Sequence, residues 1–554
     1  MQTLPLPASV STAVPAALPA GLPEYARRRT FAIISHPDAG KTTLTEKLLL
    51  FSGAIQIAGS VKARKASRHA TSDWMEIEKQ RGISVASSVM QFVHRERVVN
   101  LLDTPGHQDF SEDTYRVLTA VDAALMVIDA ANGIEAQTLR LLKICRSRNI
   151  PILTFVNKLD REVRGPLELL DEIERELGMT PIPFTWPIGM GNRFRGVYDF
   201  RSARVHRFRP GMDRLGGEDE QLDPTDAAQA ATLGAPWQDA QPEIELVTGA
   251  TPAFDRQAFI AARQTPVFFG SAINNFGVAE VLDAIVDLVP MPGPKHADER
   301  MVAPDEPRFS GVVFKVQANM DPQHRDRVAF VRVCSGRFER GMQLVNVRTR
   351  RSLRPHNVVT FLSQRRDLVD EAYPGDIIGI PNHGTLSLGD TLTEGETLHF
   401  SGLPFFAPES FRTIEVVDPM KAKQLRAALA QLGDEGAIQV FRLDGGAQLL
   451  LGAVGELQFE VVAHRLRVEY NVAARIAPAP YTMARWLDAD DETVVARFIE
   501  QNAARIAYDA ADAPTWLVRS PHEITVAQER WPQLRFSAMR ERGGARFTLV
   551  DHTA

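Results

Sequence analysis

A loop near the N-terminus carries the residue types that bind phosphate. Gly40, Lys41 and Thr42 close this loop and begin a predicted helix, shortly after the apolar run Thr30–Ser35. Backbone N–H groups at a helix N-terminus favour anions, while lysine reaches the β- and γ-phosphates and the threonine hydroxyl binds Mg²⁺. The pattern predicts a phosphate loop, although Ser35 stands where the strict motif has glycine. The predicted loop comprises Ser35, His36, Pro37, Asp38, Ala39, Gly40, Lys41, Thr42 and Thr43.

A second segment, which follows the apolar run Val98–Leu102, has the residues to handle a metal and a water molecule. A carboxylate at the carboxyl end of a parallel strand lies where an α/β sheet binds its ligand, so we expect Asp103 to hold the metal through water. The N–H of Gly106 can donate to a γ-phosphate, and His107 would orient the attacking water beside it. We therefore predict His107 and Lys41 as the catalytic residues. The whole segment comprises Asp103, Thr104, Pro105, Gly106 and His107.

Two later segments carry groups that select a purine base. Asp160 can accept two parallel N–H bonds, which guanine offers on one edge and adenine does not, so the wrong base leaves buried groups unpaired. Asn157 and the stem of Lys158 would brace the loops and cover the base. The second segment follows another apolar strand, and its backbone N–H groups would contact the base oxygen. The two segments comprise Asn157, Lys158, Leu159 and Asp160, and then Gly270, Ser271 and Ala272.

Taken in this order, the four segments resemble the guanine-nucleotide-binding domain of translational GTPases. The Gly106-His107 pair points to that branch, because small signalling GTPases usually carry glutamine at the second position. The stretch Ser72–Val85 is similar to the first switch of the bacterial peptide chain release factor 3 family, the class II release factors close to elongation factor G. Elongation factor G has threonine where this chain has Ser84, and serine keeps the hydroxyl. Further matches to the same family lie at 314–322 and 452–459.

This resemblance extends from about Arg27 to about Arg535 and implies a GTP hydrolase that the ribosome stimulates. It implies Mg²⁺ bound together with GTP or GDP, and a monovalent cation near Asp38. The implied metal ligands are Thr42, Ser84 and, through water, Asp103. Phosphoryl transfer depends on positioning and charge neutralisation. Because no internal arginine finger is evident, large-subunit RNA would place His107 in trans.

The same resemblance implies the partners. The expected partners are the ribosome, through large-subunit RNA and ribosomal proteins, and the class I release factors bound to it. The GTP-bound form would drive a class I factor off the ribosome after the finished peptide has left, so that the factor is recycled. The Gly-Gly-Gln tripeptide typical of class I factors does not occur in the sequence, so cleavage of peptidyl-tRNA is not expected.

Three alternatives stay open at this point. The chain could be a relative of elongation factor G or a ribosome-protection protein, although too few residues follow Glu469 for two more domains of typical size. It could be a GTP-dependent binding module with incidental hydrolysis, against which His107 argues. An ATP-using enzyme is the third alternative, and Asp160 argues against it.

Composition limits the class of protein. A chain of 554 residues predicts several domains, and 44% hydrophobic with 24% charged residues is ordinary for a globular protein. A net charge of −6 gives no overall basic field, so ribosome binding must depend on local patches. The 2 cysteines exclude a disulfide scaffold and suit a reducing cytoplasm. No apolar run reaches the roughly 20 residues that cross a bilayer. We expect a cytoplasmic monomer that makes no membrane contact.

The sequence predicts a multidomain α/β protein. Residues 27–290 alternate apolar strands with amphipathic helices, which predicts a P-loop GTPase domain whose parallel sheet has helices on both faces, with an insertion subdomain at about 165–262. A linker at 291–305 precedes a predicted antiparallel β-barrel at 306–400. Residues 406–535 predict a ferredoxin-like α+β domain. The expected tails are 1–26, which we predict to be disordered, and 536–554.

The insertion subdomain has its own pattern. Apolar alternation predicts short strands at Phe184–Ile188, Gly196–Phe200 and Val205–Phe208. Residues 217–254 are acidic and polar, with one helical turn expected at Glu243–Leu246. An acidic face there would suit a basic ribosomal protein, and the alternative is a spacer.

Overall fold

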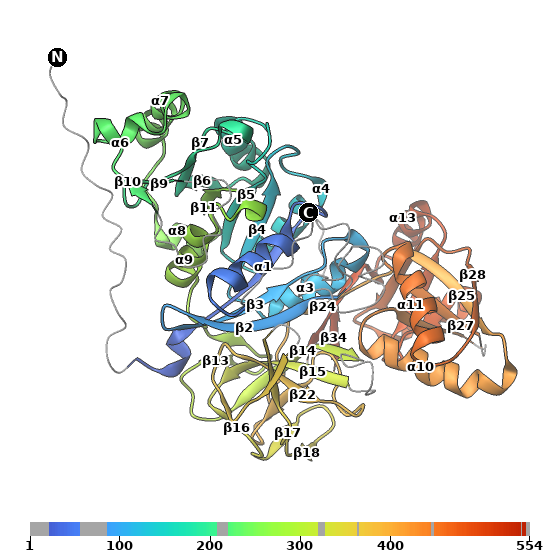
Figure 1. Ribbon diagram of the computed structural model, residues 1–554. Coiled ribbons are helices and arrows are strands. Elements are labelled where there is room, and N and C mark those ends of the chain that lie inside the picture. The colour runs from blue at the N-terminus through green and yellow to red at the C-terminus, as the bar shows by residue number, and fades with distance from the viewer. Residues whose placement is uncertain are drawn as a thin grey trace.

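Three structural parts make up the chain, each with its own sheet or sheets. The N-terminal α/β part, blue to green in Figure 1, lies above a β domain in yellow, and a C-terminal α+β part in orange to red lies beside both. This arrangement confirms the multidomain architecture expected from the sequence. A computed structural model of the protein describes residues 22–55, 86–207, 220–318, 327–362, 365–444, 448–543 and 546–549.

The N-terminal part is built on a seven-stranded sheet with the order β2-β3-β1-β4-β5-β11-β6. Neighbouring strands are parallel, except that β2 is antiparallel to β3. Alternate residues of a strand point to opposite faces. In β1, Phe31 and Ile33 therefore pack toward one layer of helices, and Ala32 and Ile34 toward the other. The strands are β1 (Arg28–Ser35), β2 (Ser88–His94), β3 (Arg97–Asp103), β4 (Ala123–Asp129), β5 (Ile152–Asn157), β6 (Thr180–Pro183) and β11 (Gln264–Phe269).

Helices cover both faces of this sheet. One layer contains α1 (Lys41–Phe51) and α9 (Val278–Leu288), which share a buried cluster with the odd-numbered residues of β1. The opposite layer contains α3 (Ser111–Thr119), α4 (Ala136–Ser147) and α5 (Pro166–Leu177). Parallel strands that are covered on both faces require nearly continuous apolar runs, and every residue of β4 and β5 is buried. The predicted α/β fold of this domain is confirmed.

Four parallel strands end where the predicted nucleotide-binding segments begin. β1 ends at Ser35, β3 at Asp103, β5 at Asn157 and β11 at Phe269. In an open α/β sheet, ligands bind outside the carboxyl ends of the strands. The topology therefore brings to one edge segments that lie far apart in the sequence.

The region expected as an insertion, about 165–262, includes part of the main domain. It contains α5 and also β6, which pairs in parallel with β11 of the main sheet. After β6, a separate antiparallel sheet has the order β10-β9-β8-β7. The three short strands expected from apolar alternation are present in it. Its strands are β7 (Thr185–Ile188), β8 (Gly196–Asp199), β9 (Arg204–Arg207) and β10 (Gln221–Leu222).

The residues expected to form one helical turn, Glu243–Leu246, are helical, but they belong to a much longer helix. The helix α7 spans Ala235–Ala250 and continues through Pro242. Proline inside a helix removes one hydrogen bond and normally signals a break. Here the buried Trp237, Ala240, Ile244 and Val247 repeat at helical spacing, and their burial outweighs that cost. Two short helices flank α7, namely α6 (Ala227–Ala231) and α8 (Arg256–Ile260).

The β domain is an antiparallel barrel. Its eight-stranded sheet has the order β18-β17-β23-β14-β15-β22-β19-β20. The preceding stretch, expected as a linker at 291–305, forms a small hairpin of β12 (Lys295–His296) and β13 (Met301–Val302) that packs on the barrel through Ala297 and Val302. The barrel strands are β14 (Ser310–Ala318), β15 (Arg327–Ser335), β17 (Leu344–Asn346), β18 (Arg351–Leu353), β19 (Val359–Leu362), β20 (Arg365–Leu368), β22 (Ile377–Pro381) and β23 (Thr391–Thr393).

The C-terminal part contains two βαββαβ units, whereas the sequence suggested one. Each unit has the ferredoxin-like order of elements, and the two join edge to edge through β26 and β30 in one eight-stranded sheet. The first unit is β25 (Ser410–Val416), α10 (Ala422–Asp434), β26 (Gln439–Leu443), β27 (Leu449–Ala453), α11 (Glu456–Val468) and β28 (Ala474–Pro478). The second unit is β29 (Met483–Asp488), α12 (Glu492–Gln501), β30 (Ile506–Tyr508), β31 (Pro514–Val518), α13 (Pro521–Arg530) and β32 (Arg535–Ser537).

Both chain ends differ from the expected tails. The strands β33 (Met539–Gly543) and β34 (Arg546–Leu549) form a sheet with β24 (Leu403–Phe406), so the described residues of the expected tail belong to the fold. Local pattern missed this pairing because β24 lies far back in the sequence and charged residues interrupt β33. At the other end, residues 1–21 of the expected disordered tail lie outside the described residues, and Glu24–Arg27 forms a 3₁₀ turn.

Candidate functional site

The loop between β1 and α1 has the geometry of an anion cradle. Gly40 precedes the first residue of α1 with φ 95°, a left-handed conformation that glycine adopts without strain. A Cβ atom at Gly40 would lie 2.2 Å from the Nδ2 atom of Asn157, so a larger residue does not fit. Within the described part of the chain, no side chain caps the helix at this end. The first N–H groups of α1 are therefore left for a ligand, as an anion would require.

Polar side chains of β1, α1 and β3 lie at the cradle. The Ser35 hydroxyl is buried and has no hydrogen-bond partner among the described residues, which fits a polar ligand there. The Lys41 Nζ atom lies 2.5 Å from the Oδ1 atom of Asp103, and both side chains are buried. This ion pair fixes the ammonium group at the carboxyl ends of β1 and β3, where an outer phosphate would compete for it.

The segment after β3 packs directly against the phosphate loop. Thr104 donates a hydrogen bond to the Ile33 carbonyl oxygen at 2.7 Å, which ties this segment to β1. A Cβ atom at Gly106 would lie 3.4 Å from the Cα atom of Pro37. The next residue, His107, is partly exposed, and its Nδ1 atom accepts a hydrogen bond from the Asp109 N–H at 3.2 Å. His107 thus borders the cradle with its ring already oriented.

One amide connects the phosphate loop with the predicted base-binding segments. The buried Asn157 donates from Nδ2 to the Ala39 carbonyl oxygen at 2.8 Å, and its Oδ1 atom accepts from the Ala272 N–H at 2.9 Å. Asn157 therefore holds three of the four predicted segments in one arrangement. It shapes the site without having to touch the ligand itself.

The carboxylate predicted to select the base is held at the same edge. The Ser271 hydroxyl donates to the Oδ1 atom of Asp160 at 2.6 Å, and the Leu159 N–H donates to the Gly270 carbonyl oxygen at 3.2 Å. A Cβ atom at Gly270 would lie 2.3 Å from the Phe276 carbonyl oxygen, so glycine is required at this turn. The two base segments are thus joined to each other by a side-chain and a backbone hydrogen bond.

Sequence reasoning missed two acidic residues at this edge. Asp129, the last residue of β4, accepts a hydrogen bond from the Lys158 ammonium at 2.7 Å, and Lys158 itself has φ 73°. Glu135 lies 2.8 Å from the Nε2 atom of His36. The position of Asp129 at the carboxyl end of a parallel strand was the available signal, because ligand-binding residues gather there.

The predicted metal ligands are only partly described. Thr42 lies in the first turn of α1 and Asp103 at the end of β3, so a hydroxyl and a carboxylate are carried by the two elements that adjoin the cradle. These are the oxygen donors that Mg²⁺ prefers, together with substrate phosphates. Ser84, with the rest of the predicted first switch, lies outside the described residues.

Family models match segments of all three parts of the chain. Residues 26–291 match the family described as "Elongation factor Tu GTP binding domain", and 308–395 match "Elongation factor G domain 2". Residues 400–528 match "Class II release factor RF3, C-terminal domain". The fold and the site therefore define a translational GTPase, an enzyme that hydrolyses GTP. The third match sets this chain apart from elongation factor G and from ribosome-protection proteins.

Close relatives narrow the class further. "Peptide chain release factor 3" of Bordetella pertussis is 68% identical over 526 residues, which cover 95% of this chain and 98% of the relative. The protein of the same name from Nitrosomonas europaea is also 68% identical, with the same coverage. The chain belongs to the peptide chain release factor 3 family. It is a ribosome-dependent GTPase of translation termination.

A solved structure supports the same arrangement of domains. A crystal structure of a protein from Thermus thermophilus is similar with a TM-score of 0.66 and 25% sequence identity, over 84% of this chain and 70% of that chain.

Among the described residues, no helix combines the length and the apolar character needed to span a bilayer.

Proposed function

We propose that Lys41, His107 and Asp160 perform the three tasks of GTP hydrolysis at this site, which are charge neutralisation, orientation of the water and selection of the base. The observation that supports this proposal is the convergence of the four segments at the carboxyl ends of β1, β3, β5 and β11, with Asn157 joining three of them. Binding residues that are held by such cross-links need little reorganisation when the ligand arrives.

In this proposal each residue acts through its own chemistry. The Lys41 ammonium and the α1 N–H groups offset the negative charge that develops on the phosphates. Mg²⁺, held by Thr42, by Asp103 through water and by Ser84, supplies further positive charge when bound. Because Nδ1 accepts from the Asp109 N–H, the neutral ring of His107 carries its proton on Nε2, and this N–H donates a hydrogen bond to the oxygen of the attacking water and so orients it. A monovalent cation near Asp38 is a further part of the proposal.

The ribosome completes the site. His107 is partly exposed at the edge of the cradle, where a partner can reach it. We infer that large-subunit RNA fixes His107 beside the water, so that hydrolysis is slow in the free protein and fast on the ribosome. The GTP-bound form then promotes dissociation of a class I release factor after peptide release, and hydrolysis lets this protein leave. The protein acts as a cytoplasmic monomer, with ribosomal proteins as additional contacts.

The test of these roles is His107→Ala, measured with purified ribosomes. We expect ribosome-stimulated turnover to fall by about 100-fold or more, which is the usual contribution of one residue that handles a proton or a water. The dissociation constant for GTP should not change, because Lys41 and Asp160 provide the binding. His383→Ala, at an exposed position of the barrel, is the matched control.

The same variants should be compared in a recycling assay on terminated ribosomes. Wild type with GTP should release the class I factor repeatedly, and without GTP it should not. His107→Ala should support release once but should then remain on the ribosome. If His107→Ala lost GTP binding yet kept normal turnover per bound nucleotide, the assignment of His107 would be wrong.

A further inference from the structure

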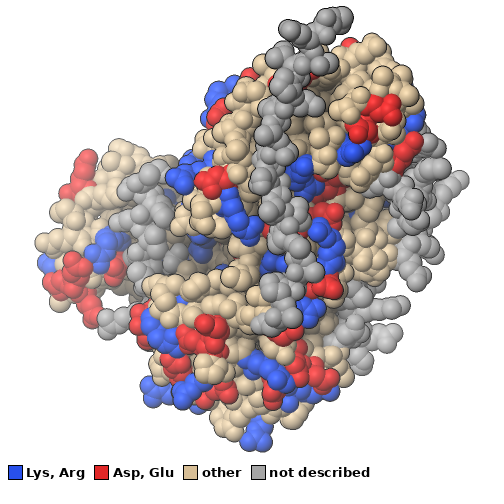
Figure 2. Space-filling model, turned by 90° about the vertical axis from the view of Figure 1, so that its left-hand side faces the viewer, with Lys and Arg blue, Asp and Glu red and all other residues tan. Residues whose placement is uncertain are grey.

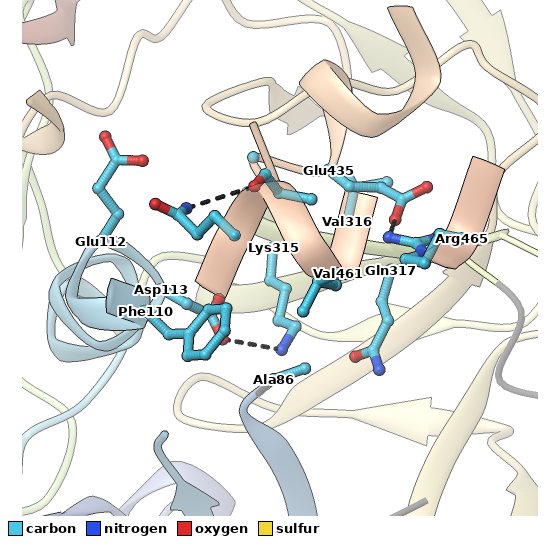
Figure 3. A pocket seen from close by; sticks show the side chains of 13 residues that line it. Ala86, Phe110, Glu112, Asp113, Lys315, Val316, Gln317, Glu435, Val461 and Arg465 are labelled. Carbon is cyan, nitrogen blue, oxygen red and sulfur yellow. Dashed lines mark hydrogen bonds and ion pairs between the residues drawn. The ribbon is translucent and has the colours of Figure 1, made fainter. Parts of the chain in front are cut away.

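A short segment with several charged residues directly after His107 connects the nucleotide site to both the barrel and the C-terminal part. It consists of the 3₁₀ turn Gln108–Phe110 and the helix α3 that follows it. Asp113 of α3 faces the barrel, where Lys315 of β14 lies 3.2 Å from its Oδ2 atom (Figure 3). Asp109 and Glu112 instead contact the C-terminal part. One short element thus contacts three parts of the chain.

Asp109 makes the contact nearest to the catalytic residue. Its backbone N–H donates to the Nδ1 atom of His107, and its Oδ1 atom lies 3.3 Å from the same nitrogen. Its other carboxylate oxygen accepts a hydrogen bond from the Leu457 N–H at 2.9 Å. Leu457 is the second residue of α11, so Asp109 caps a helix of a different domain.

The N-terminus of α11 has no capping side chain of its own at the N-cap position, so a residue of another domain can cap it. Its own N-cap residue is Gly455, which has no side chain to bind the first N–H groups. A Cβ atom at Gly455 would lie 2.0 Å from the Cγ atom of Asp109. With φ −145° and ψ 166°, the backbone of Gly455 is ordinary for any residue. The close approach of Asp109 is therefore the feature that requires glycine there.

The contacts around this cap are polar. The Oε1 atom of Glu112 accepts hydrogen bonds from Gln439 Nε2 and from the Phe406 N–H, both at 3.1 Å. A cleft lies beside these contacts, and residues of α3, β14 and α11 line it (Figure 3). Since polar contacts depend on direction more than apolar packing does, a rotation of the C-terminal part would pull on Asp109 before it disturbed the core.

We propose that Asp109 is a positioning residue for His107 and that the C-terminal domain sets its position through the N-terminus of α11. When this domain is docked as seen here, the cap holds Asp109, and Asp109 holds the His107 ring. When the domain moves, the cap breaks and His107 loses its orientation. This inference rests on the proposed role of His107, and it makes GTP hydrolysis depend on the placement of a domain that carries no nucleotide ligand.

Gly455→Ala tests the proposal from the far side of the contact. The added Cβ displaces Asp109 without changing any residue of the GTPase domain. We expect turnover at saturating ribosomes to fall by about 10- to 100-fold, as small misplacements of catalytic groups do. The dissociation constant for GTP and the KM for ribosomes should stay the same. Gly433→Ala in α10, where an added Cβ meets nothing nearer than 3.8 Å, is the matched control and should behave as wild type.

A double-mutant cycle separates positioning from general damage. Asp109→Ala should reduce turnover, and adding Gly455→Ala to it should cause no further loss, because the displaced carboxylate is already gone. Asp109→Asn, which retains an oxygen that can cap α11, should keep more activity than Asp109→Ala, and this comparison decides the question if Gly455→Ala does not fold. Additive losses, a change in the KM for ribosomes alone, or normal turnover of Gly455→Ala would each overturn the proposal.

His107→Ala, measured in parallel, distinguishes a failure of the link through α11 from a failure of the proposed role of His107. If His107→Ala loses turnover but Gly455→Ala does not, the link through α11 is wrong and the proposed function stands. If His107→Ala turns over normally, the proposed role of His107 fails first, and the positioning role of Asp109 fails with it.

Discussion

Single residues of this site mostly hold other residues in place. Asn157 uses both ends of its amide on backbone groups of two loops, and Ser271 donates to the carboxylate that we propose to select guanine. The hydroxyl of Ser271 can hold only one oxygen of Asp160, so part of the carboxylate is left for the base. Such support determines geometry to within fractions of an ångström, which catalytic sites require.

Asp160→Asn should change which base is bound. An amide presents one donor and one acceptor where guanine needs two acceptors, so we expect the dissociation constant for GTP to rise by about 100-fold or more. Xanthine carries an oxygen at that edge and should bind the variant better than guanine does. A competition assay with GTP, ATP and xanthosine triphosphate measures this change. Asp171→Asn, on the exposed side of α5, is the control.

Two results of this competition assay would contradict the proposed role of Asp160, and the first concerns the wild-type protein. If ATP competed as well as GTP, selection of the base by Asp160 would be wrong. If Asp160→Asn and Asp171→Asn bound all three nucleotides alike, the carboxylate would have no part in recognition.

At the scale of elements, short sequence patterns predicted those segments whose structure depends on neighbouring residues in the chain. The segments around Lys41, Asp103 and Asn157 could be predicted because each follows a continuous apolar strand and has a specific spacing. The full length of α7 was not predicted, because Pro242 normally marks a break, while burial of the opposite face of the helix decided the outcome. The pairing of β33 with β24 and the contact of Asp109 with α11 depend on long-range packing, which no short pattern contains.

The junction of α3 with β14 depends on one buried ammonium group. Lys315 donates to the carbonyl and hydroxyl oxygens of Ser87, each at 2.5 Å, and pairs with Asp113. Burial opposes ionisation of Asp113 most strongly, but Lys315 and the Ser87 hydrogen bonds outweigh it and hold the pKa of Asp113 below its usual value. A lowered pKa in the folded state stabilises the protein above the unfolded pKa of about 3.9, and this contribution is lost as the pH falls further.

Lys315→Met should therefore destabilise the junction. The change leaves Asp113 partly buried without its counter-ion, so we expect the free energy of unfolding at neutral pH to fall by about 3 kcal/mol. The loss should shrink in strong acid, where Asp113 is protonated in both proteins. Urea unfolding at neutral and acidic pH measures both effects. Lys143→Met, at an exposed position of α4, should change little; equal losses in the two variants would contradict the prediction.

At the scale of the whole molecule, the three parts are joined in two different ways. A single buried apolar cluster runs from Ala124 and Met126 in the main sheet to Phe314 and Phe330 in the barrel. The βαββαβ units have clusters of their own and meet α3 mainly through polar groups. Figure 2 shows acidic and basic side chains mixed on the face in view, so charge of one sign does not dominate there. We expect the GTPase domain and barrel to behave as one body.

Arg332→Met tests whether these two domains unfold together. The buried Arg332 of β15 donates to the Gly375 carbonyl oxygen at 2.7 Å and to Asp122 of the GTPase domain at 2.6 Å. Removing it leaves Asp122 buried and paired only with the more distant Lys295, at 3.6 Å, within the part of the chain that the structure describes. Breaking such a buried pair costs about 3–5 kcal/mol.

Scanning calorimetry should show whether the GTPase domain and the barrel unfold together or separately. In wild type, the GTPase domain and barrel should unfold in one transition, because neither can expose its half of the common core alone. Arg332→Met should lower that Tm, since the polar link that aligns the domains is gone. Arg337→Met removes an arginine of the same barrel whose side chain is 47% exposed, and such surface pairs contribute about 1 kcal/mol or less. If both variants kept a single transition at the same temperature, the two domains would not depend on Arg332 for their union, and the apolar cluster alone would hold them together.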